Sequence, residues 1–487
     1  MLQTKSYHDQ TRWARFLLCA SRVHCIGTAD FTGRASLNHR SLHLQRGEHE
    51  LVRVLVEHNS GETFLPSLQI LYWVPAVDGN DETLLSTLLC SRSLVRLYLQ
   101  QPDIKFGQPA PLALKSDVHL QGAPLLRVLV IKWDVQYVDI PVTRWLSNFK
   151  WLRHVELECE QLDPSDFERL GNSQSLEYIR CKITGFADCR RKIKLSSTKT
   201  LRVVGHFESI SGFVTSVEAP LLTEFLAGIG VPSTVPMLQC VQCIRSSSLS
   251  ANLHTLHLYT YNCHGVIIKL GNPVSLSSFL EPYYTLKTLR HLSIEGTVPT
   301  AAILMTDNDL NTIAQGFQRL RSLSISHTVF LPQSSLPPEW RADMHDIMNA
   351  MLLWRPGAGC APITVLRHFA LHCPHLIALS LDCVSISTEG GDLSLHSANW
   401  RSDVIGAGHL LRDLNLTRRS WKYYWDPSID PLEVGEYLNT LFPELNTVTL
   451  RERVPAACIS DKWGRVVDEI AARQRGRRAS REKTAAM

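Results

Sequence analysis

The sequence contains no run of about 18 apolar residues and no N-terminal secretory signal. The first absence argues against a membrane-spanning helix, and the second argues against export from the cell. Its 13 cysteines are odd in number and follow no regular spacing, so a disulfide framework is not expected. We therefore predict reduced thiols in a cytoplasmic or nuclear chain that has no membrane partner.

Outside its last fifteen residues the sequence also lacks an excess of charge of one sign. The formal net charge is +4, but residues 473–487 carry six Arg or Lys and one Glu, which contribute +5. The first 472 residues therefore sum to −1. A nucleic-acid-binding domain usually carries a clustered basic surface, so we expect no nucleic-acid partner.

Motifs that carry catalysis are missing as well. The sequence has no Gly-x-Ser-x-Gly elbow, no Walker-type phosphate loop and no His-Glu-x-x-His pair. No pattern places a nucleophile beside a general base. We predict a protein that is not an enzyme and that carries no cofactor.

Two short motifs leave a metal site open as an alternative. Cys240 and Cys243 form a pair, with "CH" at 263–264 downstream, and His372 and His375 form another. A structural zinc site needs four ligands, usually supplied by two spaced pairs. The adjacent second pair does not fit that spacing, so buried thiols and a helix-end histidine are the favoured interpretation, and no metal is expected.

One phrase recurs along most of the 487 residues. It has the form Leu-x-x-Leu-x-Leu with apolar substitutions, as in "LRHLSI" at 289 and "LRSLSI" at 320. The clear copies begin at positions 94, 126, 152, 176, 253, 289, 320, 376, 411 and 445, and weaker ones at 68, 201 and 222. The steps mostly exceed 20 residues, which is typical of leucine-rich repeats.

The phrase predicts a short strand whose leucines face inward while the alternating residues face outward. Linkers such as "TDNDLNTIAQGF", with Thr306 and Asp309 at capping-box spacing, predict helices between the strands. The predicted fold is an α/β leucine-rich-repeat solenoid, in which a curved parallel sheet carries helices on its convex side. A helical-repeat protein without strands is the alternative.

The pattern divides the chain into three parts. Residues 1–64 are expected to form an N-terminal capping helix and a first strand region, and residues 65–460 the solenoid. The gap at 330–375 predicts one enlarged unit, with a unit whose phrase has decayed as the alternative. Residues 461–487 are predicted to be a helix end followed by a disordered basic tail.

The chain resembles the leucine-rich-repeat part of fungal F-box-type proteins over residues 10–470, most specifically at its N-terminus. The similarity lies in "WARFLLCASRVHCI" (13–26), "FLPSLQILYW" (64–73) and "LLSTLLCSRSLVRLYL" (84–99). The resemblance implies the substrate-binding repeat region of a cullin–RING ubiquitin ligase subunit. No F-box helix cluster precedes Trp13, so binding of the ligase adaptor is expected only if an F-box is restored. A stand-alone scaffold or regulator unrelated to ubiquitin is the alternative.

Outward positions of the strands are the expected protein-binding residues, because a solenoid displays them along its concave sheet. The predicted set on the strands comprises Tyr98, His257, Tyr259, His291, Glu295 and Arg451. The loop "RRSWKYYWD" adds a second set, namely Arg418, Arg419, Trp421, Tyr423, Tyr424 and Trp425. Such aromatic and Arg side chains dominate binding hot spots, although these rings could instead cap the end of the core. The mixture of both charge signs with aromatics favours a protein partner.

Overall fold

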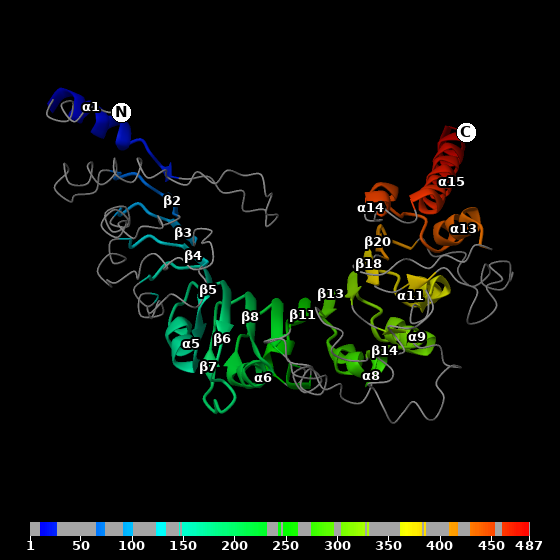
Figure 1. Ribbon diagram of the computed structural model, residues 1–487, viewed down its shortest axis with the longest axis horizontal. Helices are drawn as coiled ribbons and strands as arrows, with labels where there is room; N and C mark the ends of the chain where they lie inside the picture. The colour runs from blue at the N-terminus through cyan, green and yellow to red at the C-terminus, as the bar shows by residue number, and fades with distance from the viewer. Residues whose placement is uncertain are drawn as a thin grey trace, which may run out of the picture. The chain divides into compact units, whose positions relative to one another are not determined.

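A computed structural model describes the chain in segments. These are residues 10–26, 65–73, 91–100, 123–132, 146, 149–230, 242–244, 247–261, 274–296, 303–326, 329–330, 361–381, 384–385, 409–416, 429–452 and 460–486. They divide into a first unit, Met1–Gly205 with Ser216–Leu222, and a second unit, His206–Thr215 with Thr223–Met487. Each unit is described by itself (Figure 1).

The first unit is built on one parallel sheet. Its strands follow chain order as β1 (Cys25–Ile26), β2 (Ile70–Trp73), β3 (Arg96–Gln100), β4 (Val128–Lys132), β5 (His154–Leu162), β6 (Tyr178–Ile183) and β8 (Thr200–His206). A small second ladder pairs β7 (Ile193–Lys194) with β9 (Val217–Glu218). Helix α1 (Gln10–Ala20) precedes the sheet, and α5 (Pro164–Gly171) follows β5.

The second unit repeats the plan. Its main parallel sheet orders β10 (Glu224–Gly230), β11 (Thr255–Tyr261), β13 (His291–Gly296), β15 (Ser322–Ile325), β18 (Ala378–Leu381) and β20 (Asp413–Asn415). Shorter ladders join β12 (Val274–Ser275), β14 (Ile303–Met305) and β16 (Val329–Phe330), and pair β17 (Ala361–Pro362) with β19 (Val384–Ser385).

Helical segments alternate with the strands of the second unit. They are α6 (Phe207–Ser216), η4 (Ser248–Ser250), α8 (Leu276–Leu280), η5 (Glu281–Thr285), α9 (Asp307–Gly316), η7 (Ile363–Val365), α11 (Leu366–His372), α13 (Pro431–Leu441), α14 (Thr447–Glu452) and α15 (Ser460–Ala486). Ribbons of α9, α11 and α13 lie on one side of the strands that precede or follow them (Figure 1).

Burial along the strands confirms the predicted repeat. In the phrase at 320, Leu320, Leu323 and Ile325 are at most 1% exposed, while Ser322 and Ser324 between them are half-buried. The same alternation runs through β6 and β8. Stacked strand-and-helix units that bury their leucines in one continuous core define a leucine-rich-repeat fold. The weaker phrases at 68 and 222 also form strands, β2 and β10.

The long step from 320 to 376 adds no strand to the described sheet. β15 pairs directly with β18, with Ser322 opposite Ala378 and Ile325 opposite Leu381. The shorter irregular step from 222 to 253 behaves in the same way, since β10 pairs directly with β11.

A similar turn recurs before most strands of the two main sheets and links neighbouring repeats. The N–H of the first leucine bonds the carbonyl three residues earlier, as in Leu94 to Ser91 and Leu320 to Phe317. Serine hydroxyls in this turn donate to carbonyls of the preceding repeat, as Ser175 does to Leu152 at 2.9 Å. This hydroxyl ladder satisfies buried turn carbonyls.

Two further residue types perform the same task in the second unit. The Thr288 hydroxyl donates to the Leu253 carbonyl at 2.9 Å, and the buried Cys373 thiol lies 3.3 Å from the Ala314 carbonyl. In the turn before β20, the His409 ring makes the corresponding contacts. Its Nε2 lies 3.3 Å from the Phe369 carbonyl, and its Nδ1 lies 3.1 Å from the Leu411 amide nitrogen.

His409 makes the second unit sensitive to acid. Because the Leu411 N–H needs an acceptor, the ring must be neutral, with its proton on Nε2 facing Phe369. Burial lowers the pKa of His409 below its ordinary value, although bonds to the Cys373 and Phe369 backbones oppose this. An unfolded histidine titrates near about 6.5, so below that pH the unfolded state takes up more protons than the folded one. The contribution of neutral His409 to the free energy of unfolding is therefore present above about pH 6.5 and is lost as the pH falls below that value.

We expect His409→Gln to reduce the loss of stability between pH 7.5 and 5.5, because an amide can make both bonds without titrating. Urea unfolding at the two pH values measures this difference. His375→Gln, at an exposed histidine in a neighbouring turn, is the control. An unchanged pH dependence in the His409 variant would contradict the assignment.

The phrase at 445 is a correction to the sequence analysis. It begins like the others, since the Asn446 N–H bonds the Arg412 carbonyl at 2.8 Å. The Asn446 side chain then accepts from the amides of Val448 and Thr449 at 3.0 and 3.3 Å. This is the geometry of a helix N-cap, and the chain continues as α14, which contains Arg451. The prediction that Arg451 lies on a strand is therefore wrong.

The predicted disordered tail is also corrected, because residues 460–486 form α15. Its Trp463, Val466 and Ile470 are buried, and it packs against α13. Further along, Arg477 donates to Asn439 Oδ1 at 2.8 Å and to the Pro443 carbonyl at 2.9 Å. Arg, Lys, Glu and Ala favour helices intrinsically, so a docked first half can extend through the basic residues.

Candidate protein-binding surface

In the first unit, the outward row of the sheet begins with an aromatic stack. Tyr72 and Tyr98 occupy the same register on β2 and β3, and their rings stack with centroids 4.3 Å apart. Both side chains remain partly exposed. Burial, with the neighbouring Tyr98 hydroxyl, raises the pKa of Tyr72 to about 12. The pair therefore offers a neutral, preordered aromatic surface.

Charged side chains form a network on the following strands. Glu156 lies 3.0 Å from His154 Nε2 and 3.8 Å from Arg180, which also pairs with Glu158 at 2.8 Å. The His154 ring stacks on Tyr178 at 4.0 Å. Burial raises the pKa of Glu156, but the bond to His154 and the charges of His154 and Arg180 outweigh it, so the pKa lies below its ordinary value. The carboxylate is thus ionised and held in place.

Tyr178 stands at the centre of this network. Burial and the Glu156 carboxylate raise its pKa to about 12, and the Arg202 guanidinium lies 5.5 Å from its ring centre. Such a cation–π contact fixes both groups. The first unit therefore presents aromatic, basic and acidic groups whose rotamers are already fixed, which lowers the entropic cost of binding.

The second unit displays a smaller polar row. His257 Nε2 lies 3.5 Å from Glu295 Oε1 on the neighbouring strand, and Ser293 donates to the same carboxylate at 3.2 Å. Tyr259 lies opposite Gly228, and a Cβ added to that glycine would be 2.4 Å from the Tyr259 hydroxyl. Glycine at 228 thus allows the tyrosine to lie across β10.

The strands carry five of the predicted partner-binding residues, and the structure groups them in two places. His257, Tyr259, His291 and Glu295 share neighbouring strands of the second unit, whereas Tyr98 belongs to the first. The predicted loop residues Arg418, Arg419, Trp421, Tyr423, Tyr424 and Trp425 lie outside the described residues.

The predicted set omitted two members of the outward rows, Tyr72 and Arg202. For Tyr72 the signal was available, since the phrase at 68 places it between Leu71 and Trp73. For Arg202 it was hidden, because Thr198 occupies the first leucine position and donates to the Leu176 carbonyl at 3.1 Å. A threonine whose hydroxyl bonds a carbonyl of the preceding repeat can stand at the first leucine position. A search for leucines alone does not detect such a repeat.

Within the described segments, no group of three or more His, Cys, Asp or Glu side chains could hold a metal ion. Of the suggested zinc ligands, Cys240 and "CH" at 263–264 lie outside those segments. Burial raises the pKa of Cys373 to about 12, and it also raises the pKa of Cys181. Both thiols stay protonated at neutral pH and are poor nucleophiles or ligands. None of the helices in the described part has the length and apolar character to cross a membrane.

A search of solved structures finds matches of low sequence identity and low TM-score. An internalin (inlF) from Listeria monocytogenes is 15% identical, with 78% of this chain and 90% of that chain covered and a TM-score of 0.34. A leucine-rich-repeat protein from Leptospira interrogans is 13% identical, with 89% and 97% covered and a TM-score of 0.39. The TLR13–ssRNA13 complex gives 15% identity, 74% and 58% coverage and a TM-score of 0.32. No protein-family model and no curated protein matches the sequence.

Proposed function

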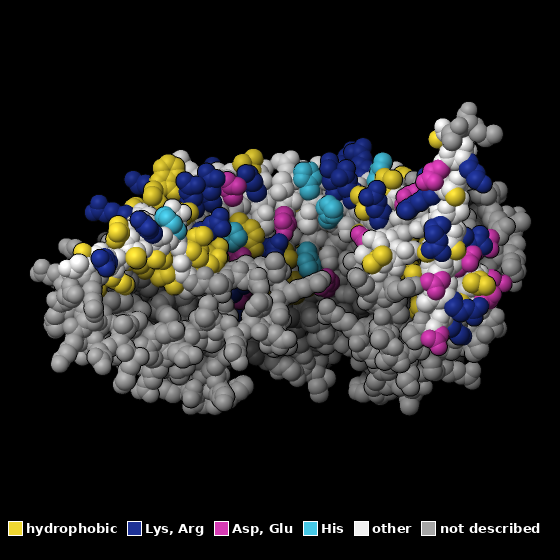
Figure 2. All heavy atoms as spheres, turned by 90° about the horizontal axis from the view of Figure 1, so that it is seen from above, with side chains coloured by type: hydrophobic (Ala, Val, Ile, Leu, Met, Phe, Trp, Pro, Cys, Tyr) yellow, Lys and Arg dark blue, Asp and Glu magenta, His cyan; other side chains and the backbone are white. Residues whose placement is uncertain are grey.

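We propose that this chain is a non-catalytic recognition protein that binds another protein on the outward faces of its sheets. The observation that carries the proposal is the ordered mixture of Tyr, His, Arg and Glu on neighbouring strands, above all the Tyr178 network. Aromatic and Arg side chains concentrate binding energy at protein interfaces. Figure 2 shows hydrophobic, histidine and charged side chains of both signs interspersed on one face of the described residues.

The finer proposal is that the partner is a substrate of a ubiquitin ligase. The resemblance of residues 13–26, 64–73 and 84–99 to F-box-type proteins supports it. We propose a cytoplasmic or nuclear location together with this role. In that role the repeats hold the substrate, and an F-box docks the ligase adaptor. The aromatic loop at 418–426 is proposed as an additional contact.

The sheet faces are tested by quantitative affinity capture with the full chain. We expect Tyr98→Ala and Tyr259→Ala each to weaken capture of a specific partner by about tenfold or more. Gly228→Ala displaces Tyr259 without removing it and should weaken capture less. Gln315→Ala, at an exposed residue of α9, is the control. Equal capture by all four variants, with unchanged melting temperatures, would refute binding on these faces.

The ligase proposal has its own test. A form of the chain extended by the upstream genomic sequence, if that sequence encodes an F-box, should co-purify with the ligase adaptor, while the present chain should not. Absence of the adaptor from both forms, with partner capture retained, would favour a scaffold unrelated to ubiquitin.

A further inference from the structure

One edge of the main sheet in the second unit carries no acidic residue over four successive repeats and four cations on the middle two. It is formed by the turns and strand starts at 251–255, 286–291, 317–322 and 373–378, which contain no Asp or Glu. The four cations of this basic edge are Lys287, Arg290, Arg319 and Arg321, and all four side chains are exposed. Histidines 254, 291 and 375 lie in the same segments.

The backbone fixes the alignment of these side chains. The Arg290 amide bonds the His254 carbonyl at 2.8 Å, the Arg321 amide bonds the Arg290 carbonyl at 2.7 Å, and the Ile377 amide bonds the Arg321 carbonyl at 2.7 Å. The residue that follows the first leucine of each phrase therefore lies in one line across four neighbouring strands. The line runs His254, Arg290, Arg321 and Ile377. Neighbouring strands are about 4.8 Å apart, so Arg290 and Arg321 project side by side.

These cations have no acidic partner within ion-pair distance among the described residues. Their field is felt locally, because burial and then the charges of Arg321, Arg290 and His254 lower the pKa of His291. Figure 2 shows basic and histidine side chains gathered together on the described surface.

The equivalent line in the first unit is different. There the line runs Arg127, Arg153, Glu177 and Lys199 on successive strands, and Lys199 pairs with Glu177 at 3.0 Å. Two neighbouring arginines are therefore followed by an acidic residue, and the line is partly neutralised. What distinguishes the second unit is that no acidic residue lies in its line from His254 to Ile377.

We propose that the basic edge binds an extended acidic segment, rich in Asp and Glu, of the protein partner. The proposal deepens the proposed function by giving the partner's chemistry. Four strands span about 14 Å, which an extended segment of about five residues matches. Arg forks bind carboxylates in bidentate geometry. A nucleic acid is less well matched, because tight binding of that kind rests on about 6–10 phosphate contacts, and the edge offers four cations.

The test uses fluorescence anisotropy with a labelled hexaglutamate peptide and the full chain. Arg290→Glu combined with Arg321→Glu should weaken peptide binding about tenfold, because two exposed ion pairs are replaced by repulsion. Arg290→Lys combined with Arg321→Lys, which retains the charge, should lose threefold or less. Arg127→Glu combined with Arg153→Glu makes the same net change at the equivalent line of the first unit and should change binding less than twofold.

Three results would overturn the proposal. Equal weakening by both charge reversals would show a response to net charge alone. Tighter binding of oligothymidylate with six phosphates than of the peptide, lost in the same variant, would assign the edge to nucleic acid. No peptide binding at low salt would leave the edge without this ligand. Because Tyr98 and Tyr259 do not belong to the basic edge, loss of partner capture in their variants reports separately on the proposed function.

Discussion

Replacing Asp309 by alanine should lower the free energy of unfolding by about 3 kcal/mol, since it removes a helix cap and leaves buried donors without acceptors. Asp309 is only 4% exposed. One carboxylate oxygen accepts from the Thr306 amide at 2.8 Å and from its hydroxyl at 2.7 Å, and Ser277 donates to the other. Ser277 belongs to α8 of the preceding repeat, so one carboxylate caps α9 and joins two repeats.

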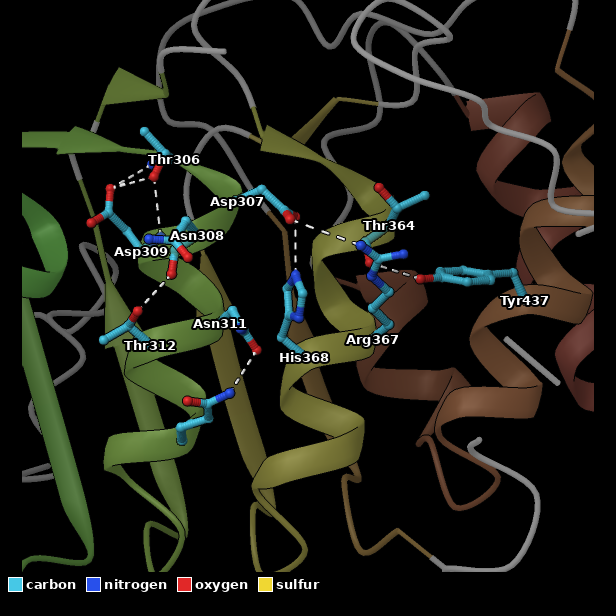
Figure 3. A network of polar contacts seen from close by, with 11 residues as sticks. Thr306, Asp307, Asn308, Asp309, Asn311, Thr312, Thr364, Arg367, His368 and Tyr437 are labelled. Atoms are coloured by element: carbon cyan, nitrogen blue, oxygen red, sulfur yellow. Dashed lines mark hydrogen bonds and ion pairs between the residues drawn. The ribbon is translucent and has the colours of Figure 1, made fainter. Parts of the chain in front are cut away.

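Thermal and urea unfolding of the full chain measure this effect. Asn308→Ala is the matched control, because its side chain is exposed on the same turn, and it should change stability by less than about 0.5 kcal/mol. Figure 3 shows the cap beside the polar contacts of α9 and α11. A loss below about 1 kcal/mol for Asp309→Ala would mean that water replaces the carboxylate and that the bridge is not structural.

The same part of the molecule contains a second polar bridge. His368 Nε2 lies 3.0 Å from Asp307 Oδ1, and Arg367 lies 3.8 Å from the same carboxylate. The bond to His368 lowers the pKa of Asp307 against the effect of burial. The Tyr437 hydroxyl donates to the Thr364 carbonyl at 3.0 Å, which extends the contacts to α13 (Figure 3). Polar contacts of this kind link three successive helices.

Phe167→Ala should strongly destabilise the first unit, with a cost of about 4 kcal/mol. Phe167 of α5 is fully buried, and its ring meets that of Phe186 edge to face with centroids 5.5 Å apart. Truncation removes the transfer free energy of the ring and leaves a cavity. Phe167→Leu should cost less than half as much, because it keeps most of the volume.

Equilibrium unfolding of Phe167→Ala, Phe186→Ala and the double variant measures how strongly the two rings are coupled. We expect an interaction energy of about 1 kcal/mol, the usual value for an edge-to-face aromatic pair. Arg169→Ala, at an exposed residue of the same helix, should be nearly neutral. Strict additivity of the two phenylalanine changes would show that the rings only fill space.

The repeat could be predicted from sequence because its signal is periodic and physical. Inward leucines such as Leu323 and Ile325 recur at fixed spacing, and the capping box of Thr306 and Asp309 was readable before the structure was known. The bridge from Asp309 to Ser277 was not, because the two residues are separated by 32 positions. Contacts between repeats depend on how long each linker is, and no local pattern encodes that.

The two errors have different causes. At 445 the phrase matches the others, but Asn446 accepts two amide bonds and starts a helix. Composition suggested a solvated tail, but Trp463 and Ile470 anchor α15 on α13. At 445 the deciding contact is a local helix cap, whereas the tail is ordered by packing against α13, a distant part of the sequence. The outward residues were predicted more easily than their network, because stacking such as that of His154 on Tyr178 requires two strands in register.

Helix α14 has a further consequence for self-association. β20 is the last strand of its sheet and pairs only with β18 among the described strands. Its other side is approached by α14, whose Thr449 hydroxyl lies 3.3 Å from Asp413. An open strand is a template onto which another molecule can add. Because the final phrase forms a helix and not a strand, α14 covers the open side of β20. We expect this cover to prevent the addition of strands from other molecules, and hence the growth of fibres.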